Sequence, residues 1–146
     1  MTSERGLTVA EHEARPLVLD SWAVLAHFQG DSAGAPVADL ISRALRHGQP
    51  AAISVVSVGE VWHAVASAAS VAEADDALTE MRRWGMEFVD VDWLLTRAAI
   101  GFRLKADLSF ADAYAAALAF RRQASLLTGA PVFKPLEDEI KIAWLV

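Results

Sequence analysis

Residues 17–20 read Leu-Val-Leu-Asp, a short apolar run that ends in an acidic residue. A strand that is buried on both faces of a parallel sheet typically reads as such a continuous apolar run. We therefore predict a buried strand at 17–20 with Asp20 at its carboxyl end. A short helix through Trp22, Leu25 and Ala26 is expected to follow.

Two kinds of apolar pattern alternate along the rest of the chain. Short apolar runs predict strands at 51–54, 86–91 and 124–128, with a possible last strand at 140–144. Apolar residues at helical spacing predict helices at 37–45, 56–70, 74–84, 92–102 and 109–119. This alternation indicates an α/β fold, a three-layer α/β/α sandwich around a mostly parallel sheet of four or five strands.

The bulk composition fits one globular domain. Of the 146 residues, 54% are hydrophobic and 22% are charged, which suffices for a buried core. We expect residues 1–16 to form a loosely held polar arm and 17–146 to form a single domain. The chain has no cysteine, so disulfides and thiolate metal sites are excluded. No signal peptide is recognisable and no apolar run reaches the roughly 20 residues of a membrane helix, so we expect a cytoplasmic protein without a membrane partner.

The net charge of −6 argues against broad electrostatic adhesion to nucleic acid. It does not exclude a nuclease, because carboxylates that bind a metal contribute to this charge and the bound cation then supplies local positive charge.

Three acidic residues fall where predicted strands end and helices begin. Asp20 ends the first strand, Glu60 lies in the first turn of the helix after the second strand, and Asp112 lies in the first turn of the helix that begins at Ser109. Because the carboxyl ends of parallel strands meet at one edge of a sheet, we expect these acids to converge. Mg²⁺ and Mn²⁺ prefer oxygen ligands, and such an ion can activate water for attack on a phosphodiester.

Each acid also has a structural interpretation. Ser57 with Glu60, and Ser109 with Asp112, fit the capping-box pattern, and Asp20 can cap the short helix behind it. For any one acid alone this interpretation is the more common one. The convergence of all three at one edge favours a metal site.

Four segments, in this order, resemble those of the PIN-domain ribonuclease toxins of VapBC-type toxin–antitoxin modules. They are LVLDSWAVLAHF (17–28), ISVVSVGEVWHAV (53–65), LSFADAYAAALA (108–119) and LLTGAPVFKPLE (126–137). The resemblance implies a PIN-like domain over 17–146 and a Mg²⁺- or Mn²⁺-dependent endoribonuclease that acts on RNA. It also implies inhibition by a cognate antitoxin and assembly as a homodimer or a larger toxin–antitoxin complex.

The resemblance assigns roles by matched position. Asp20 and Asp112 are similar to the metal-binding aspartates of these toxins, and Glu60 is similar to their glutamate in the helix after the second strand. Ser21 and Thr128 correspond to the small hydroxyl residues beside that site.

The chain departs from the family pattern at the fourth acid. The family has a Thr-Gly-Asp-type turn there, and this sequence reads Thr128-Gly129-Ala130. Alanine offers no ligand atom, so either the toxin has been disarmed by an engineered substitution or the natural protein has weak or no activity. The alternative function is a non-cleaving PIN-like module that binds an antitoxin or RNA. A DNA-directed nuclease also stays open, because no residue is identified that reads the 2′-hydroxyl.

Other motifs carry weaker signals. Glu60 and His63 form a Glu-x-x-His motif, but di-iron proteins need a second one, so His63 is interpreted as a polar helix-face residue. Arg121 and Arg122 are candidate phosphate contacts that also suit a helix C-terminus.

Two tryptophans and a set of apolar helix residues also have two interpretations. Trp22 and Trp62 are candidates for stacking on an RNA base, although burial in the core is the more frequent outcome. An amphipathic antitoxin helix is one candidate occupant of a groove, and core packing explains the same residues equally well: Val58, Val61, Val65 and Leu78.

Overall fold

The computed structural model describes residues 15–146, so the arm expected at 1–16 lies almost entirely outside the described residues. The strands are β1 (Leu17–Leu19), β2 (Ala52–Ser54), β3 (Glu87–Val89), β4 (Ser125–Thr128) and β5 (Lys141–Trp144). The α-helices are α3 (Ser21–Phe28), α4 (Val37–Arg46), α5 (Val55–Ala68), α6 (Val71–Arg83), α7 (Trp93–Arg103) and α8 (Phe110–Arg122). Two short 3₁₀ helices are η1 (Ser32–Gly34) and η2 (Pro131–Leu136).

The five strands form one sheet in the order β3-β2-β1-β4-β5, and every neighbouring pair is parallel. This confirms the predicted α/β class and selects the five-stranded, fully parallel form. The strand β1 lies at the centre, where Val18 is opposite both Ala52 of β2 and Leu126 of β4. The third strand is shorter than the predicted 86–91, since only Glu87–Val89 pairs with β2.

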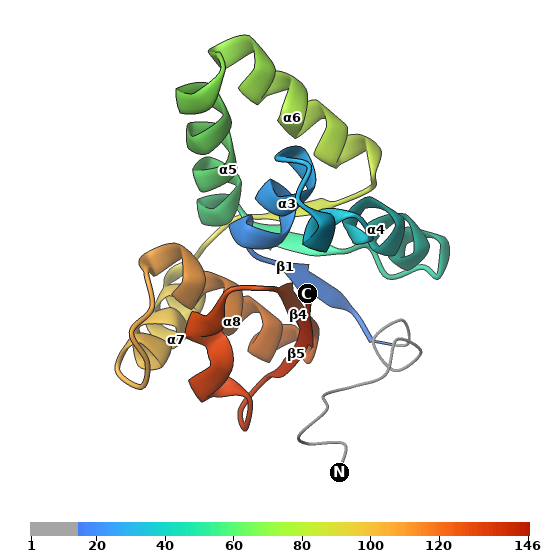
Figure 1. Cartoon of the computed structure of the whole chain (residues 1–146). Coiled ribbons are helices and arrows are strands. Elements are labelled where there is room, and N and C mark those ends of the chain that lie inside the picture. The colour runs from blue at the N-terminus through green and yellow to red at the C-terminus, as the bar shows by residue number, and fades with distance from the viewer. Residues whose placement is uncertain (1–14) are drawn as a thin grey trace.

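Alternate side chains of the central strand enter two separate cores. Leu17 and Leu19 pack into the core formed with α3, α4, α5 and α6, and Val18 packs into the core formed with α7, α8 and η2. This division is the two-residue periodicity of a strand applied to a sheet that is covered on both faces. Figure 1 shows the result, with α3, α4 and α6 above the sheet and α7 and α8 below it.

The helix α8 is held against the sheet by small side chains. It contacts β1, β2 and β4, and its buried residues are mostly alanines, which permit close approach of a helix to a sheet. These residues are Ala111, Ala113, Ala115, Ala116, Ala117, Leu118 and Ala119. The close packing fixes the start of α8, which carries Asp112, relative to the central strands.

Two segments predicted as irregular contain helical turns. The loop expected at 29–36 includes η1, and the turn expected at 129–134 is largely η2. Within residues 15–146, the helices are all too short or too polar to cross a membrane.

Candidate functional site

Asp20 and Thr128 meet at the carboxyl edge of the sheet, where the neighbouring strands β1 and β4 end. The Thr128 hydroxyl donates to Oδ2 of Asp20 at 2.5 Å, and the backbone N–H of Ala23 donates to Oδ1 at 2.9 Å. Asp20 is therefore also the N-cap of α3, as its structural interpretation required. Only 1% of its surface is exposed.

Burial makes the Asp20 carboxyl a weak acid. The pKa of Asp20 is raised from 3.8 to about 7, mainly by desolvation and in smaller part by the negative charge of Asp112. The hydrogen bonds from Thr128 and Ala23 act in the opposite direction, because they stabilise the ionised carboxylate. A cation at this position would relieve both the desolvation and the repulsion between the two acids.

Asp112 lies in the first turn of α8, on the helix that packs against the central strands. Its backbone N–H donates to Oγ of Ser109 at 3.1 Å, which confirms Ser109 as the helix cap. The side chain is half-buried and lies near enough to Asp20 to affect its ionisation. The structure thus brings these two predicted acids together across 92 positions of the chain.

Glu60 is connected to the site through Ser21, the first residue of α3. The Ser21 hydroxyl donates to Oε1 of Glu60 at 2.6 Å, and the Glu60 side chain is exposed. The predicted capping box of Ser57 and Glu60 is wrong, because Ser54 caps α5 by accepting from the Ser57 N–H at 3.2 Å. Glu60 therefore lies in the second turn of α5, where its side chain is free of a capping role.

Asp20 and Asp112, at the carboxyl edge of the sheet, fit a hydrated hard cation. Within residues 15–146, no group of three or more His, Cys, Asp and Glu side chains is arranged to hold a metal ion. Asp20 and Asp112 form a pair, and Mg²⁺ commonly takes one or two carboxylates while it keeps several waters. Asp20 and Asp112 would hold such an ion, and Ser21, next to Asp20 in the sequence, donates to Glu60.

The turn that follows β4 supports the site through its backbone. The N–H of Ala130 donates to Oγ1 of Thr128 at 3.0 Å, so the threonine hydroxyl is oriented toward Asp20. Between them, Gly129 lies under the ring of Trp22, because a Cβ at Gly129 would come within 2.2 Å of that ring. Trp22 therefore packs on this turn and is partly buried.

Trp62 also has a structural partner. Its indole Nε1 donates to Oδ1 of Asp75 at 2.9 Å, which links α5 to α6. Both tryptophans are partly buried, so a stacking role on an RNA base stays a prediction.

The serines at the start of α5 are polar residues that the sequence interpretation missed or misassigned. Ser54 and Ser57 are both buried, and Oγ of Ser57 has no hydrogen-bond partner among residues 15–146. The available signal was Ser54 directly after the apolar run 51–53, a position where a strand ends and a helix cap begins.

Both candidate phosphate-binding arginines of α8 are paired within the chain. Arg122 donates to the two carboxylate oxygens of Glu87 at 2.7 and 2.9 Å, and Arg121 donates to Asp92 at 3.2 Å. These pairs join the C-terminus of α8 to β3 and to the start of α7. Their role in the isolated chain is therefore structural.

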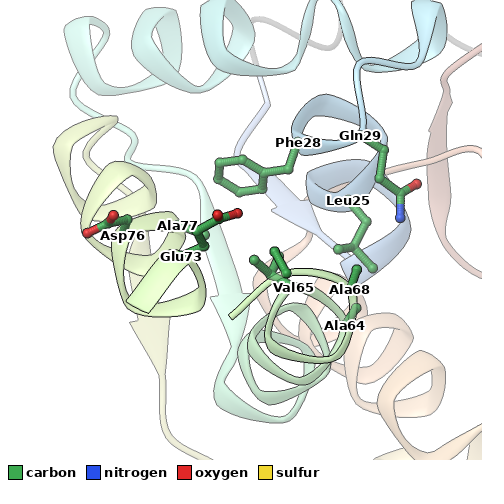
Figure 2. Close-up of a pocket in the computed structure, with 10 residues that line it drawn as sticks. Leu25, Phe28, Gln29, Ala64, Val65, Ala68, Glu73, Asp76 and Ala77 are labelled. Carbon is green, nitrogen blue, oxygen red and sulfur yellow. The ribbon is translucent and has the colours of Figure 1, made fainter. Parts of the chain in front are cut away.

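An apolar groove lies between α3, α5 and α6 (Figure 2). Its volume is about 380 Å³. Leu25 and Phe28 line one side, Val65 lines another, and Glu73 and Asp76 supply acidic groups from α6. Of the four residues predicted for a groove, Val65 lines this one. Val58 and Val61 are buried in the core, and Leu78 packs against the core.

The comparisons with known proteins agree with this fold. The family model for the PIN domain matches residues 17–134. No curated protein matches the chain in sequence.

Several solved structures are similar over most of the chain. A toxin–antitoxin complex from Klebsiella pneumoniae is 15% identical with a TM-score of 0.66, over 89% of this chain and 98% of that one. VapBC2 from Rickettsia felis, bound to a DNA fragment from its promoter, is 15% identical with a TM-score of 0.69 over the same shares. VapC20 from Mycobacterium tuberculosis, a toxin that cleaves the sarcin–ricin loop, is 17% identical with a TM-score of 0.60, over 80% of this chain and 92% of that one.

Proposed function

Because the chain belongs to the PIN domain family, we propose that it is a Mg²⁺- or Mn²⁺-dependent endoribonuclease and the toxin component of a toxin–antitoxin module. The observation that carries this proposal is the buried Asp20 carboxyl, whose pKa is raised to about 7 beside Asp112 at the carboxyl edge of the sheet. A desolvated acid beside a second acid is costly for folding alone, and a cation bound between them would offset that cost.

Each residue of the proposed site has its own role. Asp20 and Asp112 hold the cation, which when bound supplies positive charge to the scissile phosphodiester. Thr128 orients the Asp20 carboxylate through its hydroxyl. Glu60, positioned by Ser21, takes a proton from the attacking water through its exposed carboxylate.

The second candidate function is a non-cleaving module that binds an antitoxin or RNA. Ala130 favours it, because the position lacks the acid that the family pattern has there. At the edge of the sheet, Asp20 is paired with one other acid, Asp112, and Glu60 is hydrogen-bonded to Ser21. A site with so few free carboxylates also favours a module that does not cleave RNA.

Both candidate functions include an antitoxin as partner. The groove between α3, α5 and α6 is the proposed binding site for it. Two of the three solved structures named above are toxin–antitoxin complexes. We assign the groove to an apolar antitoxin segment that carries basic residues opposite Glu73 and Asp76. A homodimer and a cytoplasmic location complete the proposal.

One set of variants separates the two candidates. Mn²⁺ binding by calorimetry and cleavage of a fluorescently labelled single-stranded RNA are measured for the natural chain, Asp20→Asn and Ala130→Asp. A metal-dependent nuclease loses both signals with Asp20→Asn and gains cleavage with Ala130→Asp. If Mn²⁺ binds to none of the three proteins, Asp20 is left with its role as the cap of α3 and the binding-module function stands.

A further inference from the structure

The first residue of α8, Phe110, presents an aromatic ring to solvent beside the proposed metal site. Phe110 is 54% exposed, whereas most of the other apolar residues of α8 are buried. Asp112 lies two positions later, in the first turn of the same helix. A helix with its side chains is about 10–12 Å wide, so the Phe110 ring lies within about one helix width of the Asp112 carboxylate.

The guanidinium of Arg103 covers part of this ring. Arg103 is the last residue of α7, which lies side by side with α8 (Figure 1). Its central guanidinium carbon is 4.1 Å from the centroid of the Phe110 ring, and its Nε donates to the backbone carbonyl oxygen of Leu108 at 3.0 Å. These two contacts hold the guanidinium in one orientation. Within residues 15–146 the Nε bond is its only hydrogen bond, so the N–H donors of its terminal nitrogens stay available.

Arg103 also differs from its basic neighbours in charge pairing. Lys105 is paired with Glu139, and Arg121 is paired with Asp92. In the described part of the chain, Arg103 forms no ion pair. In a chain with a net charge of −6, such a cation near the proposed metal site attracts phosphate groups locally.

We propose that Phe110 and Arg103 form a platform that binds one unpaired RNA base next to the scissile phosphodiester. The base stacks on the part of the Phe110 ring that the guanidinium leaves exposed. The terminal nitrogens of Arg103 donate to a neighbouring phosphate, since the planar guanidinium suits phosphate oxygens. The inference rests on RNA as the ligand of the proposed function, and it names the residues that recognise RNA in its single-stranded form.

The chemistry of the platform favours an unpaired base. Every base has a face that can stack on an aromatic ring, so this contact tolerates different sequences. In a duplex the faces of the base are already stacked on their neighbours, and a protein reaches them only where the base is splayed out of the helix. The platform therefore selects loops and single strands without reading a particular base.

Binding of a short, fluorescently labelled single-stranded RNA, measured by anisotropy in buffer with EDTA, tests the stacking contact. Phe110→Leu keeps an apolar side chain but removes the ring, so the affinity should fall roughly tenfold. Phe110→Trp keeps a ring and should bind at least as tightly as the natural chain. Phe120→Leu is the matched control, because Phe120 is 57% exposed at the other end of the same helix. Equal affinities of Phe110→Leu and Phe120→Leu would overturn the proposal.

Two further measurements separate a contact with RNA from a purely structural role of the ring. The fluorescence of a 2-aminopurine placed at successive positions of the RNA should be quenched at one position by the natural chain and by Phe110→Trp, and not by Phe110→Leu. The same strand annealed to its complement should bind to the natural chain and to Phe110→Leu equally. Quenching that is the same with Phe110→Leu, or a loss of duplex binding as large as that of single-strand binding, rejects the platform.

The salt dependence of binding tests the phosphate contact of Arg103. Arg103→Gln should lower the slope of the logarithm of the association constant against the logarithm of the salt concentration by about 0.7, the effect of about one phosphate contact. Arg103→Lys keeps the charge and should restore the slope. Arg82→Gln is the matched control, because the Arg82 guanidinium lies 4.2 Å from the ring of Phe88, which packs on the other face of the sheet. An unchanged slope for Arg103→Gln contradicts the contact.

These outcomes are distinct from failure of the proposed nuclease. All of the measurements follow RNA binding without metal or cleavage, so the platform is tested even if the chain is a non-cleaving module. Binding of RNA by the natural chain with no effect of Phe110→Leu refutes the platform and leaves the proposed function standing. Absence of RNA binding by the natural chain refutes the platform together with its premise.

Discussion

The hydroxyl of Thr128 donates to Oδ2 of Asp20 across 108 positions of the chain, and the bond is buried where β4 and β1 end side by side. The same hydroxyl oxygen accepts the N–H of Ala130. A backbone group therefore orients a side chain, which in turn orients a weakly acidic carboxyl.

Asp20→Asn is expected to stabilise the metal-free protein at high pH. The folded-state pKa of Asp20 is raised to about 7, so between the unfolded value near 4 and 7 the folded state holds a proton that the unfolded state has lost. The contribution of Asp20 to the free energy of unfolding therefore falls as the pH rises from about 4 to about 7, by about 2–4 kcal/mol in total. Asparagine cannot ionise but can still accept from the Ala23 N–H.

Urea denaturation of both proteins between pH 4 and 8 measures this effect. The difference in unfolding free energy, variant minus natural chain, should grow with pH and level off above about pH 7. A difference that is constant across the range would show that Asp20 ionises with an ordinary pKa.

Metal affinity should depend on the same proton. Because Asp20 must be ionised to bind a cation, the apparent association constant for Mn²⁺ should rise about tenfold per pH unit below pH 7 and change little above it. Calorimetry at several pH values measures it, with Asp39→Asn, an exposed acid on α4, as control. An affinity that is flat from pH 5.5 to 8 contradicts the role of Asp20 as ligand.

Thr128→Val tests the orienting hydroxyl. Loss of the hydrogen bond should raise the pKa of Asp20 further, since that bond favours the ionised form. The pH at which Mn²⁺ binding reaches half of its maximum should then move upward, and the variant should lose about 1–3 kcal/mol of stability because the Ala130 N–H also loses its acceptor. Thr128→Ser keeps the hydroxyl and should restore the midpoint; equal behaviour of both variants would mean that the bond does not act on Asp20.

A large side chain introduced at the edge of the groove between α3, α5 and α6 should block antitoxin binding. Ala68→Trp fills space between α5 and α6, so the affinity for the cognate antitoxin should fall at least about tenfold. Ala72→Trp, an exposed position on α6 outside the groove lining, is the matched control. Titration calorimetry with purified antitoxin measures both. Unchanged affinity for Ala68→Trp would place the antitoxin elsewhere.

Much of the fold was predictable because its signals are local. The apolar run at 17–19 with Asp20 behind it reads directly as a buried strand and a helix cap, and Ser109 marks the start of α8. The parallel topology follows from the alternation of elements. The site was predictable to the extent that strand ends share an edge, which brought Asp20, Asp112 and Thr128 into range.

The features that could not be predicted from the sequence depend on contacts between distant segments. The cap of α5 was misassigned to Ser57 because two serines three residues apart both fit the local rule, and only the end of β2 selects Ser54. The raised pKa of Asp20 depends on burial by several elements. The packing of Trp22 on Gly129 joins the two ends of the domain, and no local pattern announces it.

The pairing of β1 with β4 also has a consequence for the order in which the protein is made. Leu17 is paired with Ser125, so the centre of the sheet stays incomplete until most of the chain has been synthesised. Helical hairpins such as α5–α6 can form early, but the long loop between β1 and β4 must close before Asp20 gains its Thr128 partner. A chain that ends between residues 112 and 125 therefore carries Asp20, Glu60 and Asp112 without the strand pair that orients Asp20. The contact between Asp20 and Thr128 can therefore form only after synthesis has passed residue 128.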